Sequence, residues 1–270
     1  MTTTYYDVPL LKAPVWTWEV PVYFFIGGAA GGAAVIGAIA SATNTSDRTL
    51  SRDARWIAAA GGPVSAALLT ADLGRPGRFL NMIRVFKPQS AMSMGSWTLT
   101  AFSGSSTAAL LPSGAAASAG SVASAMLGCA MLTYTGVLIG ATTIPVWHEH
   151  VKTLPFHFAA SGMGSAAAML TLLGHDDPAL NRISVGAAVV ETVLGASIEL
   201  NRRPSSRPLH EGTSGWVVRA GTVLSGPVPL VCRLATRSTR WRHVASVAAL
   251  AGSLLTRIGW ILAGRASKSA

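Results

Sequence analysis

Long apolar stretches that carry few or no charges recur along the whole chain, separated by short polar segments. Each is about 20 residues long, which at ~1.5 Å per helical residue is enough to cross a hydrocarbon layer ~30 Å thick. The pattern predicts eight helices, at residues 19–43, 54–73, 94–112, 119–145, 155–174, 182–200, 212–232 and 243–264. The chain is therefore expected to be an all-α integral membrane protein with about eight transmembrane helices in one bundle.

Composition agrees with this interpretation, because half of the 270 residues are hydrophobic and only 12% are charged. Such a chain is too apolar for an ordinary soluble domain. The longest hydrophilic stretch, at about residues 73–94, is too short to house a redox centre or a nucleotide-binding domain. We expect a single polytopic membrane domain over residues 1–270, with a first four-helix half at about 1–150 and a second half at about 151–264.

The net charge of +10 changes this picture little, because the Lys and Arg residues lie mostly in short loops. Basic loops of this kind favour anionic lipid headgroups, and no basic face interleaved with aromatic residues predicts nucleic-acid binding. Eight spans place 11 Lys and Arg residues on the side of the amino terminus and 8 on the other, with Arg219 and Arg257 inside spans. The small excess leaves the orientation in the membrane open.

Cys129 and Cys232 lie inside apolar segments without other metal-ligating residues at suitable spacing, so both are interpreted as small hydrophobic residues. We expect no haem, metal or iron–sulfur cluster held by this chain, since a cluster requires about four thiolates. His148, His150 and nearby His157 follow a proline, and residues two apart point away from each other on a helix. A solvated loop is expected there, with a proton-access or partner-docking surface as the alternative.

Two acidic residues stand at predicted membrane boundaries, where ionisable groups are costly unless they are paired or used. Glu19 opens the first helix beside tryptophans, where the helix dipole favours an acid in any case. Asp72 and Arg75 are three residues apart, so a continuous helix would place them on one face, either as a structural ion pair or as part of a site. The functional interpretation makes Glu19 and Asp72 proton-exchanging groups.

Four motifs, taken together and in this order, resemble the NrfD/PsrC family of membrane subunits found in respiratory oxidoreductases such as polysulfide reductase. They are Trp16-x-Trp18-Glu19-x-Pro21-x-Tyr23-Phe24-Phe25-x-Gly27-Gly28, Asp72-Leu-Gly-Arg75-Pro76-x-Arg78-Phe79, Ser90-x-Met92-Ser93-x-Gly95-Ser96-Trp97, and Tyr134-Thr135-Gly136. The resemblance covers about the first 160 residues. After about residue 200 no motif of the family can be assigned.

The resemblance implies a membrane anchor that exchanges electrons between a partner iron–sulfur subunit and menaquinone or ubiquinone in a bacterial or archaeal membrane. Through that ferredoxin-like partner it would meet a molybdopterin catalytic subunit, so the chain alone should show no catalysis. Some relatives are proposed to couple this reaction to proton movement. The implied quinone or proton-exchange residues are Glu19, Tyr23, Asp72 and Tyr134, the last at the family's quinone-contacting position. The implied partner-docking residues are Arg75, Arg78, Ser93 and Trp97.

Three ionisable residues fall inside the later predicted spans. Glu191 lies midway along the sixth, and Arg219 and Arg257 lie in the two that follow. Charges at this depth indicate a polar interior path, or a structural ion pair of Glu191 with either arginine. They also support an alternative function, a small ion or solute transporter with its path around these three residues, which the proline-interrupted seventh span would suit.

Overall fold

A computed structural model describes residues 16–43, 48–74, 77–235 and 238–267, and within these ranges every regular element is helical. The elements are α1 (Glu19–Ala42), α2 (Arg48–Asp72), α3 (Gly77–Arg84), α4 (Ala91–Ala108), α5 (Ala115–Gly140), α6 (Pro145–Glu149), α7 (Leu154–Leu172), α8 (Pro178–Leu200), the 3-10 helix η2 (Pro204–Leu209), α9 (Gly212–Ser225), α10 (Pro227–Ala235) and α11 (Thr239–Ala266). All eight predicted stretches coincide with helices, and the prediction of an all-α membrane protein is confirmed.

Not every helix is long and apolar enough to be counted as a membrane span. Five stretches qualify among the described residues, namely α1, α5, α8, the α9–α10 segment and α11. The α2–α3 pair, bent by 113°, adds a sixth if it counts as one span. The chain is therefore a multi-pass membrane protein, and the spanning roles of α4 and α7 stay predictions.

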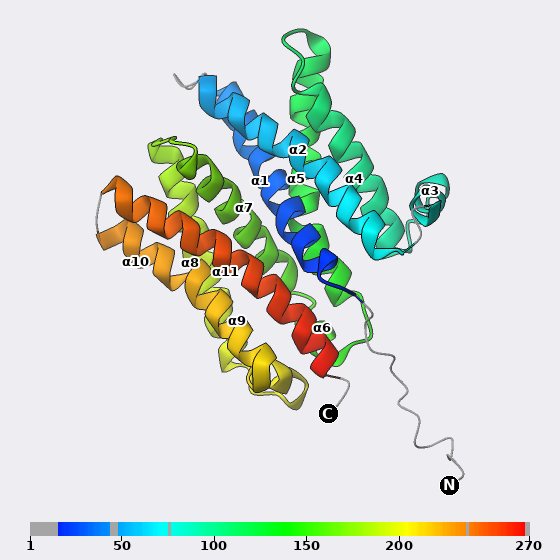
Figure 1. The fold of residues 1–270 in the computed structure, drawn as a ribbon, viewed down its shortest axis with the longest axis vertical. Coiled ribbons are helices and arrows are strands. Elements are labelled where there is room, and N and C mark those ends of the chain that lie inside the picture. Colours follow the sequence, from blue (N-terminus) through cyan, green and yellow to red (C-terminus); the bar gives the residue numbers. More distant parts are fainter. Residues whose placement is uncertain (1–15, 44–47, 75–76, 236–237, 268–270) are drawn as a thin grey trace.

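Helix α1 lies at the centre of the bundle, between α2, α4 and α5 on one side and α7, α8 and α11 on the other (Figure 1). It packs against α2, α5, α7 and α11. Its glycines permit close contact, because a Cβ on Gly31 would lie 2.7 Å from the carbonyl oxygen of Gly128 in α5. A Cβ on Gly32 would lie 3.0 Å from the carbonyl oxygen of Gly162 in α7. Small residues in α1 therefore let the backbones of α5 and α7 approach closely.

The seventh predicted span is interrupted where its prolines predict a break. Helix α9 ends at Ser225, Gly226 follows, and α10 begins with Pro227. A proline at the first helical position is tolerated because its missing N–H would have no partner there. The eighth predicted span, by contrast, is a continuous helix of 28 residues in spite of Arg257.

The two ends of the bundle differ in size. The end that includes the first residue of α1, called here the Glu19 face, also carries the connecting segments 73–90, 141–153 and 201–211, which contain α3, α6 and η2 (Figure 1). The opposite face has the short described connections 109–114 and 173–177. Among the described residues, the Glu19 face therefore carries most of the structure outside the spans.

Candidate functional site

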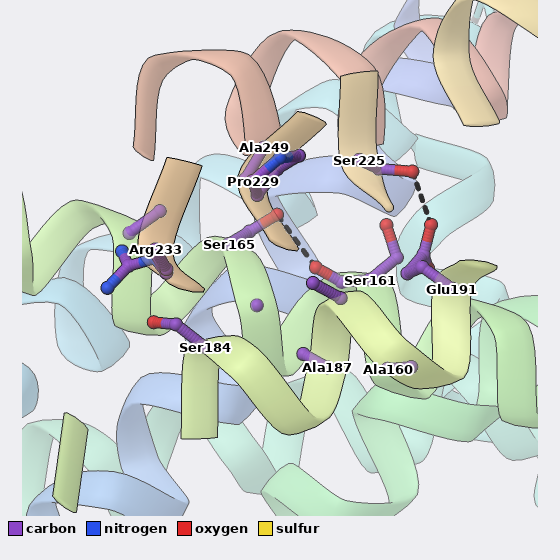
Figure 2. Close-up of a pocket in the computed structure, with 13 residues that line it drawn as sticks. Ala160, Ser161, Ser165, Ser184, Ala187, Glu191, Ser225, Pro229, Arg233 and Ala249 are labelled. Atoms are coloured by element: carbon purple, nitrogen blue, oxygen red, sulfur yellow. Dashed lines mark hydrogen bonds between the residues drawn. The ribbon is translucent and has the colours of Figure 1, made fainter. Parts of the chain in front are cut away.

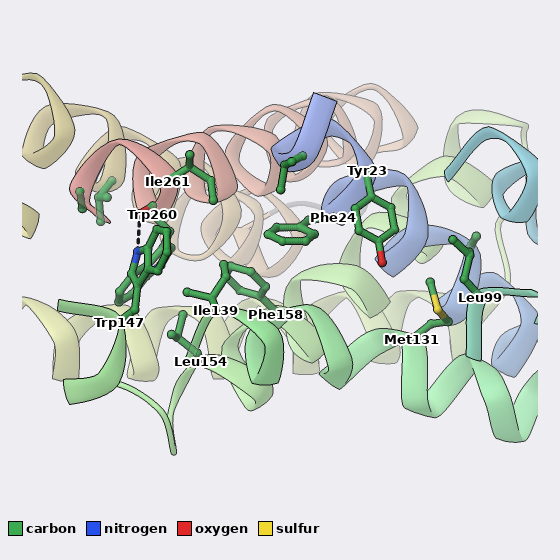
Figure 3. Close-up of a cluster of buried hydrophobic side chains, with 14 of the residues drawn as sticks. Tyr23, Phe24, Leu99, Met131, Ile139, Trp147, Leu154, Phe158, Trp260 and Ile261 are labelled. Carbon is green, nitrogen blue, oxygen red and sulfur yellow. Dashed lines mark hydrogen bonds between the residues drawn. The ribbon is translucent and has the colours of Figure 1, made fainter. Parts of the chain in front are cut away.

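The start of α1 is held on the Glu19 face by stacked tryptophans. The ring of Trp16 stacks on Trp147 of α6, with centroids 5.1 Å apart and an interplanar angle of 14°. The indole N–H of Trp147 donates to the backbone carbonyl of Trp260 in α11, at 2.8 Å, as Figure 3 shows. Arg265 also donates to the carbonyl oxygen of Trp16. These contacts fix the position of the next residue, Thr17.

Thr17 joins the two acidic residues that the sequence places at membrane boundaries. Its hydroxyl lies 2.8 Å from Oδ1 of Asp72 at the end of α2, and it also contacts Oε2 of Glu19. Its backbone N–H points to the same Asp72 oxygen at 3.3 Å. We call Glu19, Thr17 and Asp72 the Glu19–Asp72 site.

This arrangement gives one hydroxyl two carboxyl neighbours. A threonine hydroxyl has one hydrogen and can donate it to only one acceptor at a time. Contact with the second carboxyl is a hydrogen bond only when that carboxyl is itself protonated and donates to the threonine oxygen. The geometry can therefore accommodate one shared proton between Glu19 and Asp72, at the edge of the bundle.

The two predicted tyrosines lie deeper than this site. Tyr23 is 2% exposed, and Figure 3 shows its ring beside Phe24 and on the same side of α1 as Met131. Tyr134 of α5 donates its hydroxyl hydrogen to the backbone carbonyl of Ala91 at the start of α4, at 2.6 Å. Its ring occupies the space that a side chain on Gly95 would need, since a Cβ there would lie 1.9 Å from the tyrosine oxygen. The absence of a side chain at Gly95 therefore lets the Tyr134 ring pack against α4.

The predicted docking residues differ in their exposure to solvent, and one of them lies outside the described residues. Ser93 is buried, where its hydroxyl accepts from the backbone N–H of Lys87 and donates to the carbonyl of Val85, so it holds the segment before α4 in place. Trp97 is 38% exposed and packs edge-on against Phe86. Arg78 is exposed on α3, and Arg75 lies outside the described residues.

Glu191 lies inside the second half of the bundle with partners that the sequence does not single out. Its Oε2 is 3.4 Å from Nε2 of His157 in α7. The same oxygen accepts a hydrogen bond from Ser225 of α9 (Figure 2). The 3.4 Å contact is within ion-pair range, but neither ring nitrogen of His157 completes a hydrogen bond. We call Glu191, His157 and Arg257 the Glu191 cluster, since all three are at most 1% exposed.

Arg257 of α11 completes this cluster without contacting the carboxylate directly. Its guanidinium donates to the hydroxyls of Ser161 and Ser253 and lies 5.1 Å from the centre of the Phe158 ring. Its hydrogen bonds go to Ser161, Ser253 and the Phe158 carbonyl, and none goes to Glu191 among the described residues. The charge of Arg257 nevertheless acts on the Glu191 carboxylate, since buried charges of opposite sign attract one another in a low dielectric.

Arg219 is placed differently from the predicted arrangement. It forms a two-pronged ion pair with Glu199 near the Glu19 face, with its closest contact at 2.7 Å, and both side chains are more than one-third exposed. The expected pairing of Arg219 with Glu191 is therefore not formed. The reason is the direction in which α9 runs. This helix starts on the Glu19 face, so Arg219 lies beside the end of α8.

The expectation of a solvated histidine loop is wrong for two of its three residues. His150 is 4% exposed, contacts Ser206 of η2 at 3.1 Å and lies edge-on to Trp260, and His157 is fully buried. Burial lowers the pKa of His150 below its ordinary value, against the opposing effect of nearby Glu149. Only His148 faces solvent.

Glu149, the acidic member of this segment, is bound to η2. It pairs with Arg203 and accepts from Ser205 at 3.3 Å. Burial acts to raise the pKa of Glu149, but the hydrogen bond and charge of Arg203 outweigh it and leave that pKa below its ordinary value. These contacts attach α6 to η2 on the Glu19 face.

Two contributors to these sites were missed by sequence reasoning, Thr17 and His157. Thr17 sits between two tryptophans and carries no periodic signal. His157 lies inside the predicted fifth span, and a histidine inside a span is itself a sign of function. Within the described residues, no three His, Cys, Asp or Glu side chains gather in a way that could hold a metal ion.

Comparison with known proteins identifies one family. The NrfD_2 family model, described as polysulfide reductase, matches residues 1–269. No curated protein matches the chain. The match extends over nearly the whole chain, including the region after residue 200 in which no motif could be assigned.

Proposed function

The chain belongs to the NrfD_2 polysulfide reductase family, and from that premise we propose that it is a quinone-binding membrane subunit of a respiratory oxidoreductase. In this role it carries no redox centre of its own. A partner iron–sulfur subunit, which meets a molybdopterin catalytic subunit, exchanges electrons with menaquinone or ubiquinone bound by this chain.

The observation that carries the proposal is the link that Thr17 makes between Glu19 and Asp72. Reduction of a quinone to a quinol takes two electrons and two protons, so its site needs groups that deliver protons to the carbonyl oxygens. Two carboxyls that meet at one hydroxyl can hold a proton at the membrane edge. Glu19 and Asp72 deliver it there, and water at the exposed Thr17 replaces it.

Tyr134 and Tyr23 support the same region from within the bundle. In the proposed site the Tyr134 hydroxyl exchanges its present acceptor, the Ala91 carbonyl, for a quinone carbonyl. Gly95 leaves the space that the tyrosine ring occupies. Tyr23, packed beside Phe24, forms the apolar inner wall against which a ring can stack.

The partner is proposed to dock on the Glu19 face. Electron transfer requires that a donor cluster lie close to the quinone, and the connecting segments beside the Glu19–Asp72 site are on this face. Arg75, Arg78 and Trp97 are proposed to contact the partner, while Ser93 holds their segment in shape. Exposed apolar side chains beside them, Leu80, Val85 and Phe86, suit a surface that a partner covers.

The transporter alternative loses one of its three residues. A path through Glu191, Arg219 and Arg257 needs them in one interior space, but Arg219 is paired with Glu199 near the Glu19 face. The remaining pair, Glu191 and Arg257, is compatible with the proposed subunit role. We therefore keep the electron-transfer function as the conclusion.

Affinity purification of the full chain from its native membrane tests this function. The expected result is recovery of an iron–sulfur subunit by mass spectrometry, together with extractable quinone. A chain that is recovered alone and free of quinone in mild detergent would contradict the proposal.

A further inference from the structure

A groove on the Glu19 face belongs to neither of the sites described above. It is formed by η2, the first turn of α9 and the last turns of α11, and its volume is about 730 Å³. Binding sites for small molecules typically measure ~300–1,000 Å³, so the groove is large enough for such a ligand. It lies on the side of the bundle away from α3, beside which the partner is proposed to dock (Figure 1).

Two exposed arginines from different elements line the groove. Arg207 of η2 uses its Nε to donate to Oε2 of Glu211, at 2.8 Å. Arg265 of α11 uses one terminal nitrogen to donate to the carbonyl oxygen of Trp16. A guanidinium carries five N–H donors. Within the described part of the chain, each arginine therefore keeps donors that an anion in the groove can use.

The lining also contains apolar groups, which Pro208, Leu262 and Ala266 supply. The hydroxyl of Ser214 donates to the carbonyl of Pro208 at 2.7 Å, so η2 and the first turn of α9 are joined and the groove is held in shape. A lining that combines two cations with apolar surface suits an amphiphile better than a freely soluble anion.

Trp216 indicates that the groove lies at a membrane boundary. Its side chain is 74% exposed on α9, one turn after Thr213, which lines the groove. Tryptophans of membrane-spanning segments are enriched at the level of the lipid headgroups. The α9–α10 segment is long and apolar enough to span a membrane, so the residues just before Trp216 are beside headgroups.

We propose that this groove binds the phosphate of an anionic phospholipid between Arg207 and Arg265. The phosphate oxygens accept hydrogen bonds from the two guanidiniums, whose planar donors suit phosphate. An acyl chain of the lipid lies against Leu262 and Ala266. This goes beyond the proposed function, because neither the quinone nor the iron–sulfur partner takes part.

The one carboxylate in the lining weakens the site without blocking it. Glu211 pairs with Arg207, and the two side chains are 60% and 66% exposed. An exposed ion pair of this kind contributes little free energy, so a phosphate competes with Glu211 for the guanidinium. Two arginines and one glutamate leave the lining with a net positive charge, which selects an anionic lipid over a zwitterionic one.

Native mass spectrometry of the purified full chain, incubated with equal amounts of phosphatidylglycerol and phosphatidylcholine, tests the site. The first lipid bound to the wild type should be phosphatidylglycerol. Arg207→Gln should weaken that binding about tenfold, as expected for losing hydrogen bonds to a charged group. Arg202→Gln is the control, because Arg202 is 67% exposed on the same face and does not line the groove. A wild type that retains both lipids equally, or two variants that lose binding equally, would overturn the proposal.

Glu211→Gln provides a test that a misfolded variant cannot imitate. Loss of this negative charge should strengthen phosphatidylglycerol binding about threefold and leave phosphatidylcholine binding unchanged. Unchanged or weaker binding of phosphatidylglycerol would contradict the proposal.

Inorganic phosphate in excess separates a lipid from a soluble anion as the ligand. It should not displace the bound lipid, because it makes no use of the apolar lining, and displacement would contradict a lipid site. Arg207→Gln should bind a quinone analogue like the wild type, so failure of this site and failure of the quinone site are distinguishable.

Discussion

Glu19 and Asp72, on two different helices, meet through the single hydroxyl of Thr17. The relationship depends on the tryptophan stack that fixes the start of α1 on α6, since Thr17 follows directly after Trp16. A proton shared among these three residues is the basis of the quinone site proposed here.

Replacing Gly95 with alanine should displace Tyr134. The added Cβ would lie 1.9 Å from the tyrosine oxygen, and overpacking of this kind costs about 1–3 kcal/mol of folding free energy. We expect a lower unfolding temperature and weaker binding of a quinone analogue. Gly104→Ala is the control, because that position on the same helix faces open space. If the two variants have equal unfolding temperatures and bind the analogue equally, packing of Tyr134 against Gly95 is not important.

Removing Arg257 should destabilise the protein strongly. The change to leucine leaves Glu191 as an uncompensated buried charge, at a cost of about 3–5 kcal/mol. The double variant Glu191→Gln, Arg257→Leu should recover much of this loss, because neither charge then remains. Unfolding in detergent, followed by fluorescence, measures both. A double variant as unstable as the single one would show that the two charges do not compensate each other.

Burial of His150 predicts a pH-dependent stability. Its pKa is lower in the folded chain than the ordinary 6.5, so the unfolded chain binds the proton more readily. The contribution of His150 is complete above that value and is lost as the pH falls below it toward the lowered pKa. The unfolding temperature should fall over this window, and His150→Gln should fall less.

His148→Gln is the matched control for this titration, since His148 is exposed and lies only two residues away. It should keep the pH dependence of the wild type. If His148→Gln and His150→Gln flatten the curve equally, burial is not the cause.

The apolar pattern was sufficient to predict the helices, because the length needed to cross a membrane leaves a strong signal in the sequence. It could not predict α3, α6 and η2, whose 8, 5 and 6 residues are too short to be recognised by periodicity. The break before Pro227 was predicted, since proline leaves a direct mark on backbone geometry.

The candidate sites were only partly predictable. Glu19 and Asp72 stood out as acids at membrane boundaries, but nothing in the sequence brings them together, because the link depends on Thr17 and on the tertiary position of α1. For Arg219, residue type indicated a buried charge, yet the chain direction of α9 decides that it pairs with Glu199. The neighbours of His157 favour a loop, although the residue lies within the predicted span at 155–174.

Titration of a quinone analogue into the purified full chain, in wild type and two Thr17 variants, tests the central claim most directly. Thr17→Val keeps the shape but removes the hydroxyl, and it should weaken binding about tenfold, as expected for losing a hydrogen bond to a charged group worth about 1.5 kcal/mol. Thr17→Ser should bind like the wild type. Equal affinity of Thr17→Val and the wild type would contradict a quinone site built on Glu19, Thr17 and Asp72.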